Sequence, residues 1–182
     1  MAESAGETFP KSIFVHRIVR YFVKALNFVP LFIDADGKRG KSEDYKEFGF
    51  EPREQEQITA LINSTLFYWF WRSHCDGFHC GYNDVYTMPY KNVTDGHRRQ
   101  ALKRHLANLM RHLQDQSKEK TITTKAGQIR YQEFYPSDAK PIVDEIDRVL
   151  AEHYGFTEEE LDFILNYDIK YRLGRDAQSE EE

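Results

Sequence analysis

The chain has 182 residues, of which 40% are hydrophobic and 14% aromatic, and its formal net charge is −5. A chain of this length and composition can bury one core, which predicts a globular protein of one domain. Its longest apolar stretch, residues 60–71, is shorter than the roughly 20 residues that cross a bilayer, and residues 1–10 lack the apolar run of a signal peptide. We therefore expect a cytoplasmic protein with no membrane partner, and the two cysteines agree with a reducing compartment.

The net charge averages two unlike regions of the chain. Residues 137–182 contain 14 acidic and 5 basic residues, whereas residues 1–136 contain 16 acidic and 20 basic ones. The positive excess of the first region is well below that of proteins held to nucleic acid mainly by phosphate contacts. If the chain binds DNA, we expect a local face to do so, with help from another domain.

Two strands are predicted near the N-terminus. Residues 12–23 mix β-branched and aromatic residues with Arg17 and Arg20, which predicts a strand with a basic side, and residues 28–33 predict a second, short strand. On a strand, residues three apart point to opposite faces, so Arg17 and Arg20 are not expected to reach one ligand together unless a bulge intervenes. Arg20 is expected to act with residues of the loop that follows the second strand instead. The turn-rich loop that follows, residues 34–42, carries Lys38, Arg39 and Lys41.

The next segment predicts one long helix, from Pro52 to about Ser73. Its apolar residues form a continuous helical stripe and its aromatic residues cover much of the remaining surface, so the helix is expected to be buried nearly all round. A crowded polar loop begins directly at the end of this helix. Binding residues are often placed in such loops, and this one contains Arg72, His74, Asp76, His79, Tyr82, Asn83 and Asp84.

Helices and a hairpin make up the rest of the chain. Thr94 or Asp95 can cap a helix that runs to about Ser117 and carries Arg98 and Arg99 in its first turn; two β-rich runs around residues 125–127 predict a hairpin. A helix over 137–155 and a fourth helix with a Thr157–Glu160 capping box follow, and the tail from residue 175 is expected to be disordered.

This order of elements predicts an α+β fold with a small mixed or antiparallel sheet packed against the buried aromatic helix, and with a C-terminal helical part. We divide the chain into a core over residues 1–136, a helical pair over 137–174 packed on it, and the tail over 175–182.

Four soft or borderline metal ligands lie within seven residues, namely His74, Cys75, His79 and Cys80. A structural zinc site needs two separated ligand pairs, whereas this is one compact cluster, so we expect no metal. A small metal-dependent enzyme that uses this cluster is therefore the weakest of three hypotheses for the function, and the two stronger ones are given below. The carboxylates of residues 144–147 and 158–162 lie on amphipathic helices, which favours solvated acidic faces over a metal site.

The chain shows no catalytic motif of its own. Met88-Pro89-Tyr90 resembles the N/D-P-P-Y/F motif that holds the target amino group in amino-methyltransferases, but the leading amide or acid and the first proline are missing. A glycine-rich turn for S-adenosylmethionine, a phosphate-binding loop and a nucleophile elbow are also absent from the sequence. Whether the chain takes part in an enzyme therefore depends on a partner that would supply the catalytic groups.

Three segments together resemble a known family. They are N-S-T-L-F-Y-W-F-W (63–71), S-H-C-D-G-F-H-C-G-Y-N-D-V (73–85) and the C-terminal run from Lys140 to Gly174, which ends in L-D-F-I-L-N-Y-D-I-K-Y-R-L-G. This order resembles the C-terminal part of adenine-specific DNA methyltransferases of type IIG and related restriction-modification or defence systems, in which a methylase domain is followed by a TaqI-like target-recognition domain. The resemblance covers about residues 11–176 and lacks the methylase half, so we expect an excised specificity module or one part of a split enzyme.

The resemblance implies a prokaryotic module that binds double-stranded DNA, reads base edges and works with a methylase domain or subunit, which would hold the S-adenosylmethionine. It does not assign individual residues. From their chemistry we expect base contacts from Arg72, His74 and Asn83 and phosphate contacts from Lys38, Arg39, Lys41, Arg98 and Arg99. His79, in the same loop as His74, is also expected to contact DNA.

The main alternative is a protein-interaction or assembly subunit that docks on a methylase or another partner through its basic helix and acidic C-terminal helices. The sequence leaves open the recognition site, the oligomeric state and whether the isolated module binds DNA.

Overall fold

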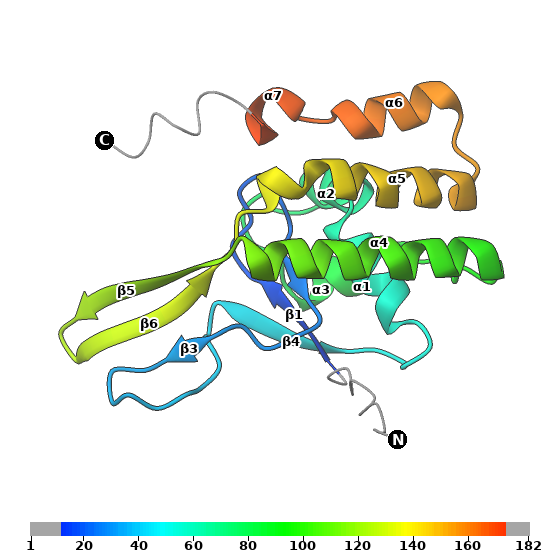
Figure 1. The fold of residues 1–182 in the computed structure, drawn as a ribbon. Coiled ribbons are helices and arrows are strands. Elements are labelled where there is room, and N and C mark those ends of the chain that lie inside the picture. Colours follow the sequence, from blue (N-terminus) through cyan, green and yellow to red (C-terminus); the bar gives the residue numbers. More distant parts are fainter. Residues whose placement is uncertain (1–11, 174–182) are drawn as a thin grey trace, which may run out of the picture.

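The computed structural model describes residues 12–173, and the chain folds into the expected α+β architecture (Figure 1). In chain order the elements are β1 (Ser12–His16), β2 (Ala25–Leu26), β3 (Phe32–Ile33), β4 (Tyr45–Gly49), α1 (Gln55–Asn63), α2 (Thr65–His74), α3 (Tyr82–Tyr86), α4 (Gly96–Asp115), β5 (Lys118–Thr124), β6 (Gly127–Glu133), η1 (Pro136–Ala139), α5 (Lys140–Tyr154), α6 (Glu158–Asn166) and α7 (Ile169–Arg172).

The first sheet is antiparallel, with the strand order β2-β1-β4. Its central strand buries Ile13, Phe14 and Val15, β-branched and aromatic residues whose side chains alternate between the two faces, so the strand is buried on both sides. The expected strand over 12–23 is wrong beyond His16, because there the chain turns back toward β2 and the His16 amide donates to the Lys24 carbonyl at 2.9 Å. The short strands β2 and β4 were not predicted from the sequence.

The second sheet has the order β3-β6-β5 and is also antiparallel. Its hairpin of β5 and β6, which we call the arm, confirms the predicted hairpin and projects away from the helices (Figure 1). All seven residues of β5 are exposed. At the tip Gly127 has a φ of +135°, and a Cβ there would lie 3.0 Å from the Ala35 carbonyl oxygen, so glycine lets the arm approach the loop that follows β3. That strand is shorter than the one predicted over 28–33.

The aromatic segment is buried as predicted, but it forms two helices instead of one. Eight of the nine residues of α1 and five of the ten residues of α2 are buried. The break lies at Ser64, whose hydroxyl oxygen accepts from the Phe67 amide at 3.0 Å. The carboxylate of Asp147 accepts from the Thr65 and Leu66 amides, each at 3.0 Å, and so satisfies two further free donors at the start of α2.

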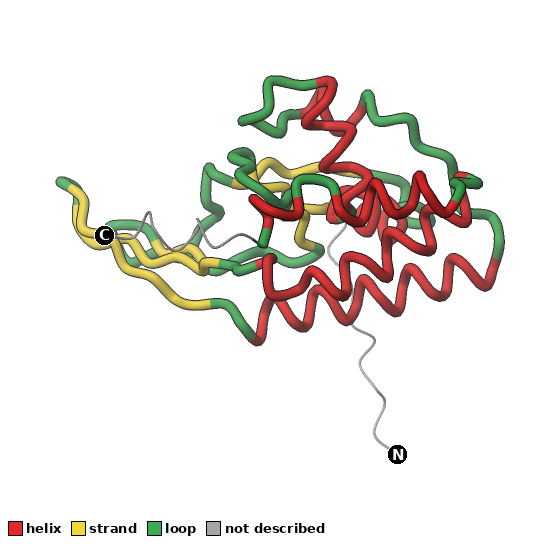
Figure 2. The backbone as a smooth tube through the Cα atoms, turned by 90° about the horizontal axis from the view of Figure 1, so that it is seen from above, coloured by secondary structure: helices red, strands yellow, loops and turns green. Residues whose placement is uncertain are grey.

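The remaining helices follow their sequence signals closely. Asp95 caps α4 by accepting from the Arg98 amide at 2.8 Å, and the predicted narrow apolar stripe of this helix is buried. Gly155 ends α5 in the left-handed conformation, and Thr157 and Glu160 form the predicted capping box of α6. Seen from above, the helices gather at one end of the molecule and the arm extends from the other (Figure 2).

One prediction about the acidic residues is wrong. Asp147 was assigned to a solvated acidic face, yet it is 1% exposed, because it faces α2 instead of solvent.

Arg172, on the last turn of the described chain, is also buried and is 3% exposed. Its Nη1 donates to the Thr65 hydroxyl at 2.8 Å and its Nε to the Tyr21 carbonyl at 3.0 Å. Hydrogen bonds from Asp147 of α5 and Arg172 of α7 thereby connect the carboxyl-terminal helices to the start of α2.

The hydrophobic core extends across the predicted boundary at residue 136, since Val143, Ile146 and Leu150 of α5 belong to the same cluster as Leu61 of α1 and Leu106 of α4. The division of the chain at this point stays a prediction, and the tail over 175–182 lies outside the described residues. Within residues 12–173 no helix combines the length and the apolar character needed to span a membrane.

Candidate nucleic-acid interface

An open groove of about 1010 Å³ lies between the arm and the body of the protein, and we call it the arm groove. One wall comes from the body: residues 16–24, the loop 41–44 and Arg172. The other wall comes from the arm and the residues that flank it, with Ile122, Ile129, Tyr131 and Tyr135 among its lining side chains. The groove is therefore built from segments that are far apart in the sequence.

The body wall is rich in cationic side chains. Arg17, Arg20, Lys24 and Lys41 line it, together with the deeply buried Arg172. Three carboxylates, Glu43, Asp44 and Glu133, lie in the same groove, so positive charge exceeds negative charge there only modestly.

Arg17 and Arg20 line the same groove, which corrects the expectation that they point to opposite faces. The expectation assumed strand geometry through residue 23, whereas the strand ends at His16 and the chain then curves around the groove. Arg17 forms an ion pair of 3.6 Å with Asp44, and both side chains are about half exposed. Arg20 is exposed, and none of the ion pairs or hydrogen bonds found within residues 12–173 occupies its guanidinium.

The half-buried Lys24 adds an unusual cation to this wall. Burial lowers the pKa of its ammonium group below the ordinary value, and the nearby carboxylate of Glu133 opposes that shift only in part. Burial also lowers the pKa of His16, with a further contribution from Lys24, which favours a neutral imidazole near pH 7. An anionic group bound in the groove would stabilise the charged form of Lys24.

The arm contributes an apolar and aromatic wall. The pairs Ile122–Ile129 and Lys120–Tyr131 are directly opposed across the hairpin, so their side chains share one face of the sheet. Ile122 is 46% exposed, which is high for a large aliphatic residue. The ammonium group of Lys118 lies 5.1 Å from the centre of the Tyr135 ring, so cations also border this wall.

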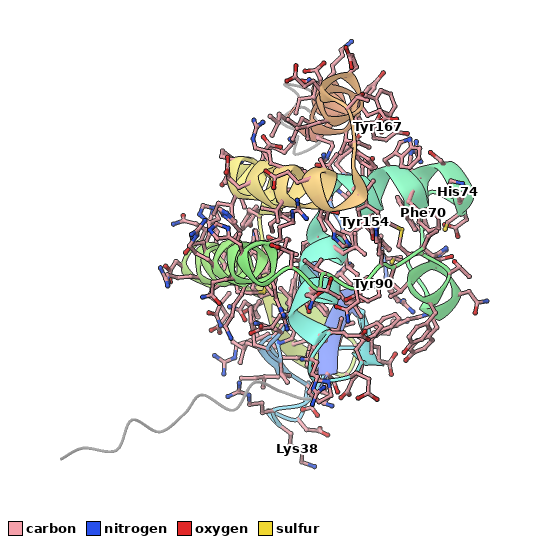
Figure 3. All side chains as sticks on the ribbon, turned by 90° about the vertical axis from the view of Figure 1, so that its right-hand side faces the viewer. Lys38, Phe70, His74, Tyr90, Tyr154 and Tyr167 are labelled. Carbon is pink, nitrogen blue, oxygen red and sulfur yellow. The ribbon has the colours of Figure 1, made fainter. Side chains whose placement is uncertain are left out.

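The loop after β3 holds three of the residues predicted to contact phosphate. The Asp34 carboxylate orders this loop by accepting from the Asp36 and Lys38 amides, at 3.0 and 2.8 Å. Lys38 and Arg39 are exposed on the loop, and Figure 3 shows Lys38 at the bottom of the molecule, far from His74. Lys41 lines the arm groove, and its ammonium pairs at 2.6 Å with Glu47, which is not among the residues that line the groove.

The polar loop after α2 uses most of its side chains for internal contacts. The Arg72 guanidinium donates to the Gly77 carbonyl at 3.2 Å, and a Cβ at Gly77 would lie 2.5 Å from Arg72 Nη1. The His74 ring stacks on Phe70, with 4.7 Å between the ring centres, and its Nδ1 lies 2.8 Å from the Phe70 carbonyl oxygen.

His79 Nδ1 lies 2.8 Å from the carboxylate of Asp76, which also accepts from the Phe78 and His79 amides. These hydrogen bonds lower the pKa of Asp76 to about 2. Asn83 lies not in the loop but on the short helix α3, with its side chain exposed. The neighbouring Asp84 caps that helix by accepting from the Gly81 amide at 2.6 Å. The loop is thus a tightly bonded structure, whereas the exposed side chain of Asn83 on α3 is available to a ligand.

The two cysteines of this loop are poorly suited to chemistry as thiolates. Burial raises the pKa of Cys80 to about 12 and that of Cys75 to about 11, so both thiols are protonated near pH 7. Within residues 12–173 no three histidine, cysteine, aspartate or glutamate side chains are grouped closely enough to hold a metal ion.

The last two of the residues predicted to contact DNA lie at the start of α4. Arg98 forms an ion pair of 3.6 Å with Glu152 of α5, and Arg99 donates to the Thr94 carbonyl at 3.3 Å. The nine predicted contact residues are therefore distributed over three places, and Lys41 is the member of the set that lines the arm groove. Sequence reasoning did not find Lys24 or Arg172, although His16, Arg17, Arg20 and Lys24 form a visible run of basic side chains.

Comparisons of the chain with protein-family models, with curated proteins and with solved structures find no match. Function must therefore be inferred from the chemistry and geometry of the described residues.

Proposed function

We propose that this chain is the DNA-recognition module of an adenine-specific DNA methyltransferase or restriction-modification enzyme, and that double-stranded DNA binds along the arm groove. The observation that carries the proposal is the groove itself, in which the exposed cations Arg17, Arg20 and Lys41 face an apolar and aromatic wall. Phosphate contacts from lysine and arginine supply most of the affinity of proteins for DNA, and contacts to base edges supply specificity.

The two walls suit these two tasks. Arg17, Arg20 and Lys41 are long and exposed, so they can follow a phosphate backbone that runs past the body. The exposed Ile122 on the arm can contact a thymine methyl group, and Tyr131 offers an aromatic ring to sugars and bases. A two-stranded ribbon is also one of the two elements that the major groove of DNA admits.

Methyl transfer itself would belong to a partner. The sequence holds no motif for S-adenosylmethionine or for the target amino group, so the cofactor and the reacting base would lie in a methylase domain or subunit. In this assignment the chain positions the DNA and selects its sequence.

The test is a binding titration with a labelled duplex pool that has a randomised core, followed by sequencing of the bound fraction. We expect the full chain to bind and to enrich a defined motif. The double variant Arg17→Ala/Arg20→Ala removes two groove cations and should weaken binding by about tenfold or more at moderate salt.

The matched control is Arg104→Ala/Arg111→Ala, which changes the net charge equally on the exposed side of α4. It should leave the affinity within about twofold of the wild type, because these side chains lie outside the groove. Failure of the full chain to bind duplex DNA, or an equal loss in both double variants, would contradict the proposal.

A further inference from the structure

A second cavity lies between the end of β4, α1 and α3, and we call it the α1–α3 pocket. Its volume is about 220 Å³, and none of its lining residues lines the arm groove. Aliphatic side chains, including Ile58, Leu61 and Ile62 of α1, form its floor. The volume corresponds to about seven water molecules, which is enough for one long side chain and too small for a helix or a strand.

Aromatic rings border the pocket, and part of their surface is exposed. Phe50, Tyr86 and Tyr90 line it, and the ring centres of Phe50 and Tyr86 are 5.6 Å apart. Tyr86 is 55% exposed and stacks against Tyr82, which is 47% exposed. Exposed tyrosines gathered beside an apolar cavity are typical of protein interfaces, where aromatic residues are enriched.

One carboxylate, that of Glu54, lies in this apolar and aromatic lining. Its negative charge is close enough to Tyr90 to contribute, after burial, to the raised pKa of that phenol. None of the ion pairs or hydrogen bonds between side chains of residues 12–173 involves Glu54, whereas the nearby Glu56 pairs with Lys103 at 3.0 Å. The pocket thus offers rings, an aliphatic floor and a carboxylate that has no ion-pair partner among residues 12–173.

Elsewhere in this chain, an arginine side chain lies among aromatic rings and near a carboxylate. The guanidinium of Arg172 lies 4.2 Å from the ring centre of Phe22 and 5.0 Å from that of Tyr68. Burial lowers the pKa of Arg172, and the nearby negative charge of Asp147 opposes that shift. A planar guanidinium can stack on aromatic rings and pair with a carboxylate at once, while its methylene stem covers apolar surface. The ammonium group of lysine is more strongly hydrated and suits a desolvated aromatic pocket less well.

We propose that the α1–α3 pocket receives an arginine side chain from a protein partner. The stem lies on the aliphatic floor, and the guanidinium reaches the aromatic rim and the carboxylate of Glu54. The exposed Tyr82 and Tyr86 then contact the surface of the partner around that arginine. This site does not depend on the DNA-binding assignment, because the two cavities share no residue.

The test uses the full chain and N-acetyl-arginine-methylamide as the probe, with N-acetyl-norleucine-methylamide as an uncharged probe that retains only an apolar stem. Binding is followed by the NMR shifts of the methyl groups of Ile58, Ile62 and Val85, which line the pocket. We expect saturable shifts of these methyl groups with the arginine probe. The Glu54→Gln variant should bind it about fivefold more weakly, the effect of losing one partly exposed ion pair.

The control variant is Glu51→Gln, which removes an equal charge from an exposed position outside the pocket and should bind the probe like the wild type. Three results would overturn the proposal: no shifts at the pocket methyl groups, equal binding of the norleucine probe, or unchanged binding in the Glu54→Gln variant. The Glu54→Gln variant should also keep full affinity for the duplex pool, so that failure here is distinguishable from failure of the DNA-binding assignment.

Discussion

Asp147 and Arg172 show how single polar residues hold this fold together. Asp147 lies on α5 and accepts from the first two amides of α2, and Arg172 reaches the same turn through the Thr65 hydroxyl. Both side chains are almost fully buried, where an unpaired charge is costly and a paired one fixes its partners in place. Three elements that are distant in sequence therefore meet at the start of one helix.

Part of this arrangement was visible in the sequence. Val143, Ile146, Asp147 and Leu150 occupy positions i, i+3, i+4 and i+7, so Asp147 lies within the apolar stripe of its helix. An acid at such a position predicts a buried carboxylate with specific partners. The prediction of a solvated face placed all the acids of this amphipathic helix on its polar side, although Asp147 falls among the apolar positions. Arg172 gave no such signal, since its partners at residues 21 and 65 are distant along the chain.

The first prediction concerns pH. Burial raises the pKa of Asp147 from 3.8 to about 6, so between these values the folded protein binds more protons at this site than the unfolded chain. Stability contributed by this group is therefore present below about pH 4 and is lost as the pH rises to about 6. Urea unfolding of wild type and Asp147→Asn at several pH values measures the effect. The wild type should lose stability relative to the variant across this window, and a constant difference between the two proteins would refute it.

At the scale of elements, local chemistry predicted the helices and the hairpin, and long-range pairing decided the short strands. The start of α4 and the capping box of α6 follow from residues within one turn of each helix. The strands β2 and β4 owe their conformation to pairing with β1, and no strong alternation marks them in the sequence. The strand over 12–23 was predicted too long for the same reason: its length is set by the pairing of β1 with β2 and β4, which ends at His16.

The break between α1 and α2 was missed because the apolar stripe continues through it. Serine occurs within helices and also caps them, so Ser64 alone does not decide between the two. The buried carboxylate of Asp147 decides it by supplying acceptors for the next two amides. The periodicity of the apolar residues is visible in the sequence, but the contact between the Asp147 carboxylate of α5 and the start of α2 is not.

The second prediction tests this cap. Ser64→Ala removes the acceptor for the Phe67 amide and should lower the free energy of unfolding by about 1 kcal/mol. Ser73→Ala, at an exposed position near the end of α2, should change it by less than about 0.5 kcal/mol. Chemical denaturation of both variants gives the comparison. Equal stability of the two variants would mean that Ser64 does not cap α2.

At the scale of the whole molecule, the candidate site could be predicted only in part. The basic run at residues 16–24 and the loop with Lys41 are visible in the sequence, but the arm groove also needs residues 122–137 and Arg172. Only the tertiary fold brings these segments together. The separation of residues 38–41, 72–83 and 98–99 into three places likewise follows from the positions of the two sheets and α4, which no local pattern encodes.

The charge distribution agrees with two separate surfaces. Most cations of the arm groove come from the basic first part of the chain, whereas the α1–α3 pocket has one carboxylate within an apolar lining. DNA and a protein partner could therefore bind at the same time without competing for the same side chains.

The salt dependence of DNA binding tests the central claim most directly. Each phosphate contact contributes about 0.9 to the slope of log affinity against log salt concentration. If DNA lies in the arm groove, the triple variant Arg17→Ala/Arg20→Ala/Lys41→Ala should show a slope smaller by about two to three than that of the wild type. The Arg104→Ala/Arg111→Ala protein should keep the wild-type slope. Identical slopes for the wild type and the triple variant would contradict the assignment of DNA to this groove.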